Sequence, residues 1–288
     1  MQKTLKILPV SAAAVAVIAV IFRVFQLIVV VDYTEMGFFD ADAGFFATWG
    51  LYLILLIGAV IFIAAAILDK RSGSAAYDRP AASLSPKQTA ILGVAFLLGA
   101  CLRLYNLVFD SKESALGFIG EALIFVLFTL IGFLILGSRR LKPVVGYLHI
   151  VICISCTMNA AALFMQDTII IRVSDELLLL LSYICSVLFF LALGRFISGI
   201  ESKLTRFKLL ILGGLTAALS LCASLAGYIA LIVDAEYIEP HMAMHPISET
   251  GTGIIALAVI MILYGRSSLP VEEGPERTEG YEGNELHP

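Results

Sequence analysis

Two arginines lie inside apolar stretches of the sequence, and they are the residues with the clearest capacity for chemistry. Arg23 is followed by Gln26 and Arg103 by Asn106, and the two pairs are offset by 80 residues. Residues three apart share one face of a helix, so each pair would present a guanidinium beside an amide. Such a pair can hold a carboxylate or phosphate with several fixed donors. A charge in a bilayer costs at least about 2.5 kcal/mol on insertion scales, so both arginines need a partner or a function.

Glu121 and Asn159 are the candidates to complete such a site. Glu121 lies four residues after Gly117, just inside an apolar run, and we expect it to be the counter-ion of Arg103 or Arg23. A partly buried carboxylate beside another charge can also titrate near neutrality, so proton coupling is its alternative role. Asn159 is predicted to lie at a depth similar to that of the two arginines. The arginines could thus form internal ion pairs, bind a ligand, or extend toward the headgroups.

A second candidate site lies in the last predicted outer loop, where His241 and His245 enclose two methionines. Imidazole and thioether ligands suit a soft metal such as copper, or zinc if Glu239 or Glu249 contributes. The alternative is an exposed loop with some sensitivity to pH.

A short motif recurs with the arginines. The pattern Arg-x-x-Gln/Asn-Leu is followed by a Gly-Phe turn, at Met36–Phe39 and again at Leu116–Ile119. This combination resembles uncharacterised multi-spanning membrane proteins of clostridia-like Gram-positive bacteria. The resemblance covers the first two predicted hairpins, and it implies a membrane bundle without implying an activity.

The composition identifies the elements that must position these residues. The chain is 60% hydrophobic and 15% charged, whereas soluble domains carry about 25% charged residues. Apolar runs near or above the length that crosses about 30 Å of hydrocarbon recur throughout. Backbone groups in lipid must bond within their own segment, so these runs should be helices. We therefore predict an all-α integral membrane bundle of about eight transmembrane helices in four hairpins, with the first two hairpins repeated. The runs are 7–31, 47–68, 89–109, 117–137, 144–166, 174–197, 208–233 and 248–265.

Basic residues are concentrated on one side of this predicted bundle. Of the nineteen lysines and arginines, fifteen fall at the termini, in the loops after even-numbered runs or at the adjoining ends of the runs, two are the intramembrane arginines, and only Lys112 and Arg172 fall on the other side. The positive-inside rule then places both termini in the cytoplasm of a multi-pass protein of the cell membrane. Residues 1–266 form the polytopic transmembrane domain, and residues 267–288 form a disordered acidic cytoplasmic tail. The five cysteines all lie within predicted spans, so we expect no disulfide framework.

The leading functional hypothesis is a transport or substrate-binding membrane component for a small anionic or zwitterionic solute. The alternative is a structural or signalling membrane protein whose arginines clamp the bundle and whose cytoplasmic loops or tail bind a protein partner. The sequence has no P-loop, no zinc-protease helix and no serine-hydrolase elbow, and no segment typical of a nucleic-acid binder. We therefore expect no enzyme, no cofactor and no nucleic-acid partner. The predicted solute site lies in the outer half of the bundle and comprises Arg23, Gln26, Arg103, Asn106, Glu121 and Asn159.

Overall fold

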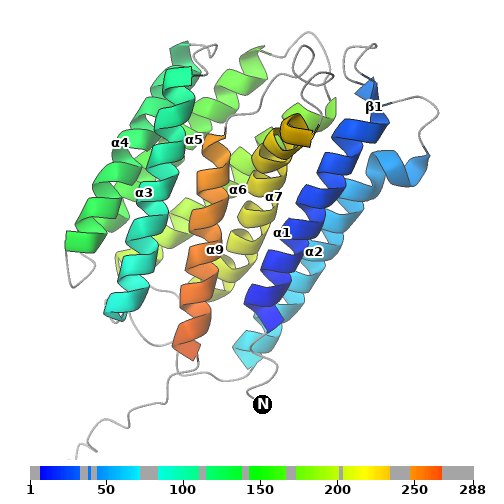
Figure 1. Ribbon diagram of the computed structural model, residues 1–288. Helices are drawn as coiled ribbons and strands as arrows, with labels where there is room; N and C mark the ends of the chain where they lie inside the picture. Colours follow the sequence, from blue (N-terminus) through cyan, green and yellow to red (C-terminus); the bar gives the residue numbers. More distant parts are fainter. Residues whose placement is uncertain are drawn as a thin grey trace, which may run out of the picture.

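The computed structural model describes residues 7–32, 38–39, 44–71, 84–109, 115–137, 143–166, 173–200, 204–233 and 247–267. Figure 1 shows that these residues are almost entirely helical. Strand structure in the described part is a short ladder in which β1 (Val31–Asp32) pairs antiparallel with β2 (Phe38–Phe39). The α-helices are α1 (Ile7–Phe25), α2 (Phe45–Arg71), α3 (Pro86–Phe109), α4 (Ala115–Gly137), α5 (Pro143–Gln166), α6 (Val173–Ile197), α7 (Thr205–Val233) and α9 (Ser248–Ser267).

Helices α1 to α7 are each long and apolar enough to cross a membrane, with spans of 21 to 29 residues. Helix α9 contributes a shorter apolar stretch, Ser248–Leu263. Large apolar side chains also point outward, and Ile57 and Phe133 are 59% and 63% exposed. Such side chains are compatible with a lipid environment, where apolar surface carries no hydration penalty. The helical, multi-pass character predicted from the sequence is therefore confirmed for the described part of the chain.

Local signals define the ends of the helices that carry the candidate residues. At the start of α3, the backbone N–H of Gln88 donates to Ser85 Oγ at 3.3 Å, and the backbone N–H of Ser85 donates to Gln88 Oε1 at 3.0 Å. This reciprocal capping box, with Pro86 as first helical residue, fixes the beginning of the helix that bears Arg103. Helix α6 ends at Ile197 and is followed by Gly199, whose φ of 72° is left-handed, and the backbone N–H of Ile200 donates to the Arg195 carbonyl oxygen at 3.1 Å.

The first helix ends differently from the third. A π-helical turn, η2 (Gln26–Val30), continues α1 before β1 begins. The corresponding part of α3, around Asn106, is regular α-helix. The two segments that look alike in sequence therefore have different backbones at the position of the amide residue.

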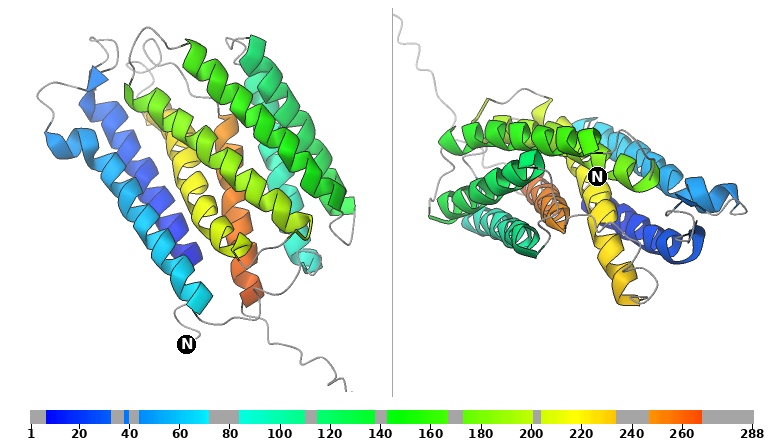
Figure 2. Two further views of the ribbon diagram at one scale, coloured as in Figure 1. Left: turned by 180° about the vertical axis from the view of Figure 1, so that it is seen from behind. Right: turned by 90° about the horizontal axis from the view of Figure 1, so that it is seen from above.

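The helices are arranged as a ring with one hairpin packed on its outside. Helices α3, α4, α5, α6, α7 and α9 contact one another in that order, and α9 contacts α3 to close the ring. Helices α1 and α2 pack on each other and both pack on α7 (Figure 2). The ring brings together residues that are far apart in the sequence.

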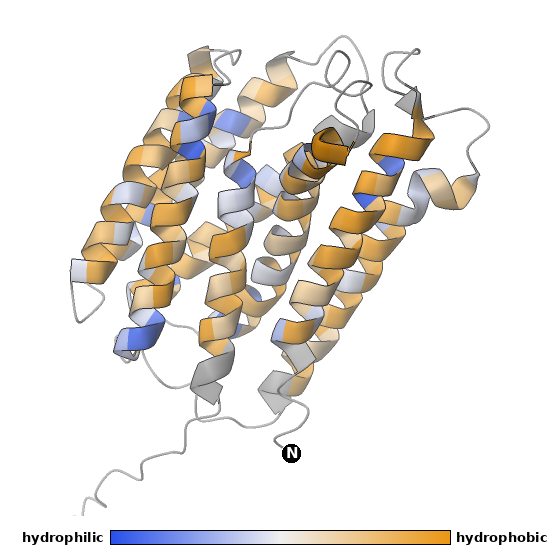
Figure 3. Ribbon diagram, in the orientation of Figure 1, coloured by the Kyte–Doolittle hydropathy of each residue, from blue (hydrophilic) through white to orange (hydrophobic). Residues whose placement is uncertain are grey.

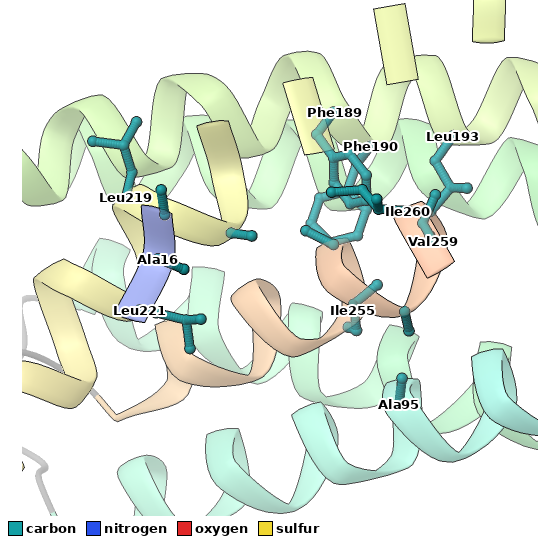
Figure 4. Close-up of a cluster of buried hydrophobic side chains, with 14 of the residues drawn as sticks. Ala16, Ala95, Phe189, Phe190, Leu193, Leu219, Leu221, Ile255, Val259 and Ile260 are labelled. Atoms are coloured by element: carbon teal, nitrogen blue, oxygen red, sulfur yellow. The ribbon is translucent and has the colours of Figure 1, made fainter. Parts of the chain in front are cut away.

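Helix α9 is the most enclosed part of the ring. Of its described side chains at 248–263, only Met261 is exposed. A Cβ on Gly251 would lie 2.6 Å from the Cα of Gly99 on α3, so the absence of side chains lets the two backbones touch. In Figure 1, α9 begins lower than the upper end of α3, which places its first turn inside the bundle. Figure 4 shows its core contacts with other helices, among them Phe189, Phe190 and Leu193 of α6 and Ala95 of α3.

Candidate functional site

Arg103 is the centre of a buried group of charged and polar side chains within the ring. Its Nη1 donates to both carboxylate oxygens of Glu121 on α4, each at 2.6 Å. Its Nη2 donates to Glu249 Oε1 at 2.8 Å and to Thr252 Oγ1 at 2.9 Å, both on α9. The side chains of Arg103, Glu121 and Glu249 are 0–1% exposed. One guanidinium thus binds two carboxylates in the interior of the protein, away from its outer surface.

Further hydrogen bonds extend this group around the whole ring. Asn159 Nδ2 of α5 donates to Glu121 Oε1 at 2.7 Å. Glu249 Oε2 lies 3.5 Å from Ser182 Oγ of α6, and Ser182 Oγ lies 2.8 Å from Ser220 Oγ of α7. Every helix of the ring therefore contributes a side chain. We call this set the Arg103 cluster; it consists of Arg103, Glu121, Asn159, Ser182, Ser220, Glu249 and Thr252.

The position of the cluster is visible in the hydropathy of the ribbon. In addition to the hydrophilic lower end of α3, Figure 3 shows hydrophilic segments in the upper half of α3 and at the beginning of α9. A hydrophilic segment of α1, outside the ring, lies at a similar level. The Arg103 cluster therefore lies in the half of the bundle opposite the start of α1.

The cluster has more negative than positive groups. With both carboxylates ionised, one guanidinium and two carboxylates leave a formal charge of −1. The ring of Phe128 lies 5.2 Å from the guanidinium carbon and stabilises the cation without changing this count. An uncompensated charge in a buried site is strongly unfavourable, so the surplus must be neutralised by a proton or a cation.

Several polar atoms of the cluster and its surroundings remain without a hydrogen bond. Arg103 Nε, Asn159 Oδ1 and Ser248 Oγ are buried and have no partner among the described residues. Buried polar groups in folded proteins are nearly always paired, and exceptions often mark a functional site. The cluster could therefore supply additional donors and acceptors to a bound molecule.

A glycine allows Asn159 to reach the cluster. Gly120 precedes Glu121 on α4, and a Cβ at this position would overlap Asn159 Oδ1. The same Cβ would lie 3.2 Å from the Ser155 carbonyl oxygen of α5. The two helices can pack this closely because Gly120 has no side chain.

The other arginine has different partners. Arg23 Nη1 donates to Gln26 Oε1 at 3.0 Å. Gln26 Nε2 in turn donates to the carbonyl oxygens of Ala47 and Thr48, at 2.8 and 3.1 Å, in the first turn of α2. The Arg23–Gln26 pair thus joins α1 to α2, although it resembles the Arg103–Asn106 pair in sequence.

The structure brings together part of the predicted residue set. Glu121 contacts both Arg103 and Asn159, and of the two arginines considered as its counter-ion the structure pairs it with Arg103. Asn106 is buried one turn from Arg103 on α3.

The proposed metal ligands His241 and His245 lie outside the described residues. Within the described ranges, the structure contains no group of three or more His, Cys, Asp or Glu side chains that could hold a metal ion.

Several members of the Arg103 cluster were not predicted from the sequence. Glu249 was considered only as a metal ligand, yet its position as an acid at the start of an apolar run was a usable signal. Ser182, Ser220 and Thr252 carry no such signal, because hydroxyls inside membrane helices are common packing residues.

An aromatic layer separates the cluster from a buried histidine. Phe128 contacts Phe96 and Phe190, with ring centroids 5.3 and 5.6 Å apart, and Phe96 contacts His149 at 5.8 Å. His149 Nδ1 bonds the Val145 carbonyl at 2.8 Å, whereas Nε2 has no partner among the described residues. The layer lies on the side of the cluster toward the start of α1, because α4 runs from Glu121 to Phe128 in that direction.

The chemistry of the cluster is that of charge binding. Its surplus carboxylate can hold a proton or a cation, and its donors and acceptors suit a small polar molecule with both charges. Comparisons with family models, curated proteins and solved structures found no match to this chain. A functional assignment therefore depends on the geometry of the cluster.

Proposed function

We propose that this chain is a transport or substrate-binding component of the cell membrane, with the Arg103 cluster as its charged site. The observation that carries the proposal is a single buried guanidinium shared by two carboxylates inside a six-helix ring. Intramembrane ionisable residues are costly and commonly mark the path of a substrate or ion.

The proposal includes eight membrane spans, arranged as four hairpins, with both termini in the cytoplasm. The 20 residues of α9 have a length of about 30 Å, which matches the hydrocarbon thickness. Helix α9 ends on the side where α1 begins, as an even number of crossings requires (Figure 1). The distribution of lysine and arginine in the loops agrees with this orientation. The 80-residue offset between Arg23 and Arg103 supports a repeat relation between the first two hairpins.

Two properties of the cluster favour a binding site over a purely structural ion pair. A structural pair is most stable when its charges cancel and all its hydrogen bonds are made. The Arg103 cluster has an additional carboxylate, and Arg103 Nε and Asn159 Oδ1 lack partners among the described residues.

The charge balance also favours one class of solute. A simple anion would encounter a guanidinium that already binds Glu121 and Glu249. A solute with an ammonium group can instead pair with the surplus carboxylate, and Arg103 Nε remains available to donate to a polar group of the same solute. We therefore propose a small solute that carries an ammonium group, an amine or an amino acid, as the ligand class.

A structural or signalling role is the second candidate. Both terminal nitrogens of Arg103 are engaged in internal bonds, as they would be in an assembly clamp. In that case the cytoplasmic loops or tail would bind a protein partner, and the cluster would only hold the six helices together.

Thermal unfolding of the purified protein distinguishes these functions. The protein is unfolded in the presence of small amino acids, small carboxylates and small amines. A ligand present at 100 times its Kd stabilises the folded state by about 2.7 kcal/mol. We expect an amine or an amino acid to raise the Tm of the native protein and not that of Glu249→Gln.

Arg23→Gln is the matched control, because it removes a buried arginine outside the ring. Its basal stability should fall, but the increase in Tm with ligand should persist. If no solute class raises the Tm and a protein partner co-purifies with the native chain, the structural role is correct.

A further inference from the structure

We infer that Glu249 carries an exchangeable proton in the resting state, and that this proton is released when a cationic amine binds the Arg103 cluster. The inference specifies the coupling ion of the proposed transport function. The presence of the proton depends only on the cluster, whereas its release by solute rests on the proposed function.

The two carboxylates differ in how well their negative charge is stabilised. Glu121 accepts three hydrogen bonds at 2.6 to 2.7 Å, two from Arg103 and one from Asn159. Glu249 accepts one short bond at 2.8 Å from Arg103 and has a contact of 3.5 Å to Ser182. Charge-assisted bonds from a guanidinium and short bonds from amides stabilise the ionised form. The ionised carboxylate is therefore Glu121, and the protonated one is Glu249.

The proton belongs on Glu249 Oε2. Its other oxygen, Oε1, accepts from Arg103, whereas Oε2 faces Ser182 Oγ. A proton on Oε2 lets the carboxyl donate to Ser182, and Ser182 can then donate its own hydrogen to Ser220 at 2.8 Å. This chain of donors has a consistent direction, and it leaves Arg103 and Glu121 as a neutral pair.

Among the described residues, Arg103 is the full positive charge close to Glu249. Arg103 from α3, Glu121 from α4 and Cys156 from α5 are the charged or titratable groups close to it. Helices α6 and α7 present Ser182 and Ser220, and Arg23 of α1 bonds Gln26 instead. The amino end of α9 contributes a partial positive charge of about half a unit, which reduces the surplus without cancelling it.

Binding of an ammonium group would replace this proton. The protonated Glu249 carboxyl and a solute ammonium would form a carboxylate–ammonium pair, with the carboxyl proton leaving to solution. The total charge of the cluster stays at zero before and after this exchange when the solute carries a net charge of +1, as an amine does. Entry of an amine and loss of a proton are then linked, because both neutralise the same surplus carboxylate. A zwitterion adds its own carboxylate and would bind without releasing the proton.

Infrared spectroscopy of the full-length protein in lipid nanodiscs tests for the proton. A protonated carboxyl gives a carbonyl band distinct from that of a carboxylate. We expect this band at neutral pH in the native protein. We expect its loss in both Glu249→Gln and Glu121→Gln, since each variant has one carboxylate for one guanidinium.

Two conservative variants identify which of the two carboxyl groups carries the proton. Glu249→Asp should move the band to another frequency, whereas Glu121→Asp should leave the frequency unchanged. The opposite pattern would assign the proton to Glu121 and overturn the inference. Size-exclusion profiles and thermal unfolding establish that each variant is folded, and Glu249→Gln should be about as stable as the native protein because it replaces a neutral carboxyl by a neutral amide of similar size.

A bound sodium ion is the competing explanation for how the surplus negative charge is neutralised. The Tm is measured in sodium chloride and in choline chloride at equal ionic strength. A higher Tm in sodium together with no carboxyl band would show that a metal cation neutralises the surplus, and the inference would be wrong. A band that persists in both glutamine variants would also refute it. If the band shows the expected pattern in the variants but no solute changes the Tm, the proton on Glu249 is supported and the transport function is rejected.

Discussion

Arg103 binds the carboxyl groups of Glu121 and Glu249, so its loss would leave the ionised Glu121 carboxylate buried without a counter-ion. Breaking a buried ion pair by removing one partner typically costs about 3–5 kcal/mol, because the remaining charge is uncompensated. We expect Arg103→Gln to lower the free energy of unfolding by this amount. Chemical denaturation in detergent micelles, followed by circular dichroism, measures the change.

A triple variant separates charge from packing in this result. Arg103→Gln combined with Glu121→Gln and Glu249→Gln replaces every charged group by a neutral amide, of the same size as the glutamates and smaller than the arginine. It should recover a large part of the lost stability, because no buried charge remains. A triple variant as unstable as the single one would show that shape rather than charge dominates at this position.

Gly120 controls the position of Asn159 and can be tested separately. In Gly120→Ala the new methyl group would overlap Asn159 Oδ1 and press on the Ser155 carbonyl. Alanine favours helices over glycine, but overpacking at a helix contact typically costs about 1–3 kcal/mol. We therefore expect a net loss of stability in thermal unfolding. The pair Gly120→Ala with Asn159→Ala should be more stable than Gly120→Ala alone, because the smaller side chain removes most of the overlap.

At the level of the helices, the positions of the long apolar helices were largely predictable from the sequence. The predicted spans agree with the ends of the observed helices to within three residues. This agreement has a physical cause, since the length of an apolar run and the need for internal hydrogen bonds act locally along the chain. Glu121 was expected to pair with Arg103 or Arg23, and its pairing with Arg103 is a local contact because the two residues lie on consecutive helices.

The remaining part of the site was not accessible to such local reasoning. Glu249 is separated from Arg103 by 146 residues, and the two meet only because α9 closes the ring against α3. Which helices become neighbours, and how each is rotated, follows from side-chain packing over the whole bundle. The sequence likeness between Arg23 and Arg103 was equally insufficient to predict their partners, because α1 lies outside the ring.

The Arg103 cluster therefore depends on the contact between α3 and α9. Gly251 of α9 has no space for a side chain, because its neighbour is the backbone of Gly99 and cannot rotate away. In Gly251→Ala we expect α9 to be displaced from α3, with a loss of about 1–3 kcal/mol in stability. Glu249, two residues earlier, would move away from Arg103.

Gly137→Ala is the matched control for this prediction. Gly137 is the last residue of α4, and a Cβ there would meet no atom within 4 Å. Its substitution should change stability by no more than about 0.5 kcal/mol. Equal effects of the two substitutions on thermal unfolding would contradict the close crossing of α3 and α9.

On the scale of the whole molecule, the ring and the outer hairpin have different interior chemistry. The six ring helices share one hydrogen-bonded cluster with two carboxylates, whereas α1 and α2 are joined by Arg23, Gln26 and backbone carbonyls. A rearrangement at the cluster would therefore be transmitted around the ring through every helix in it. The α1–α2 hairpin contacts the ring mainly through α7, so it can remain a fixed support during such a change.

The position of the carboxyl terminus tests the overall architecture, because it depends on whether α9 crosses the membrane. With eight spans, epitope tags at the two ends of the full-length protein must lie on the same side. We expect both tags to be inaccessible to antibody in intact cells and accessible after permeabilisation, since loops rich in lysine and arginine remain in the cytoplasm. A single cysteine replacing Lys112, in a variant without the native cysteines, should in contrast react with an impermeant maleimide in intact cells. If the carboxyl-terminal tag were accessible in intact cells while the amino-terminal tag remained protected, α9 would not span the membrane. The first turn of α9, with Glu249, would then require a different location relative to the lipid.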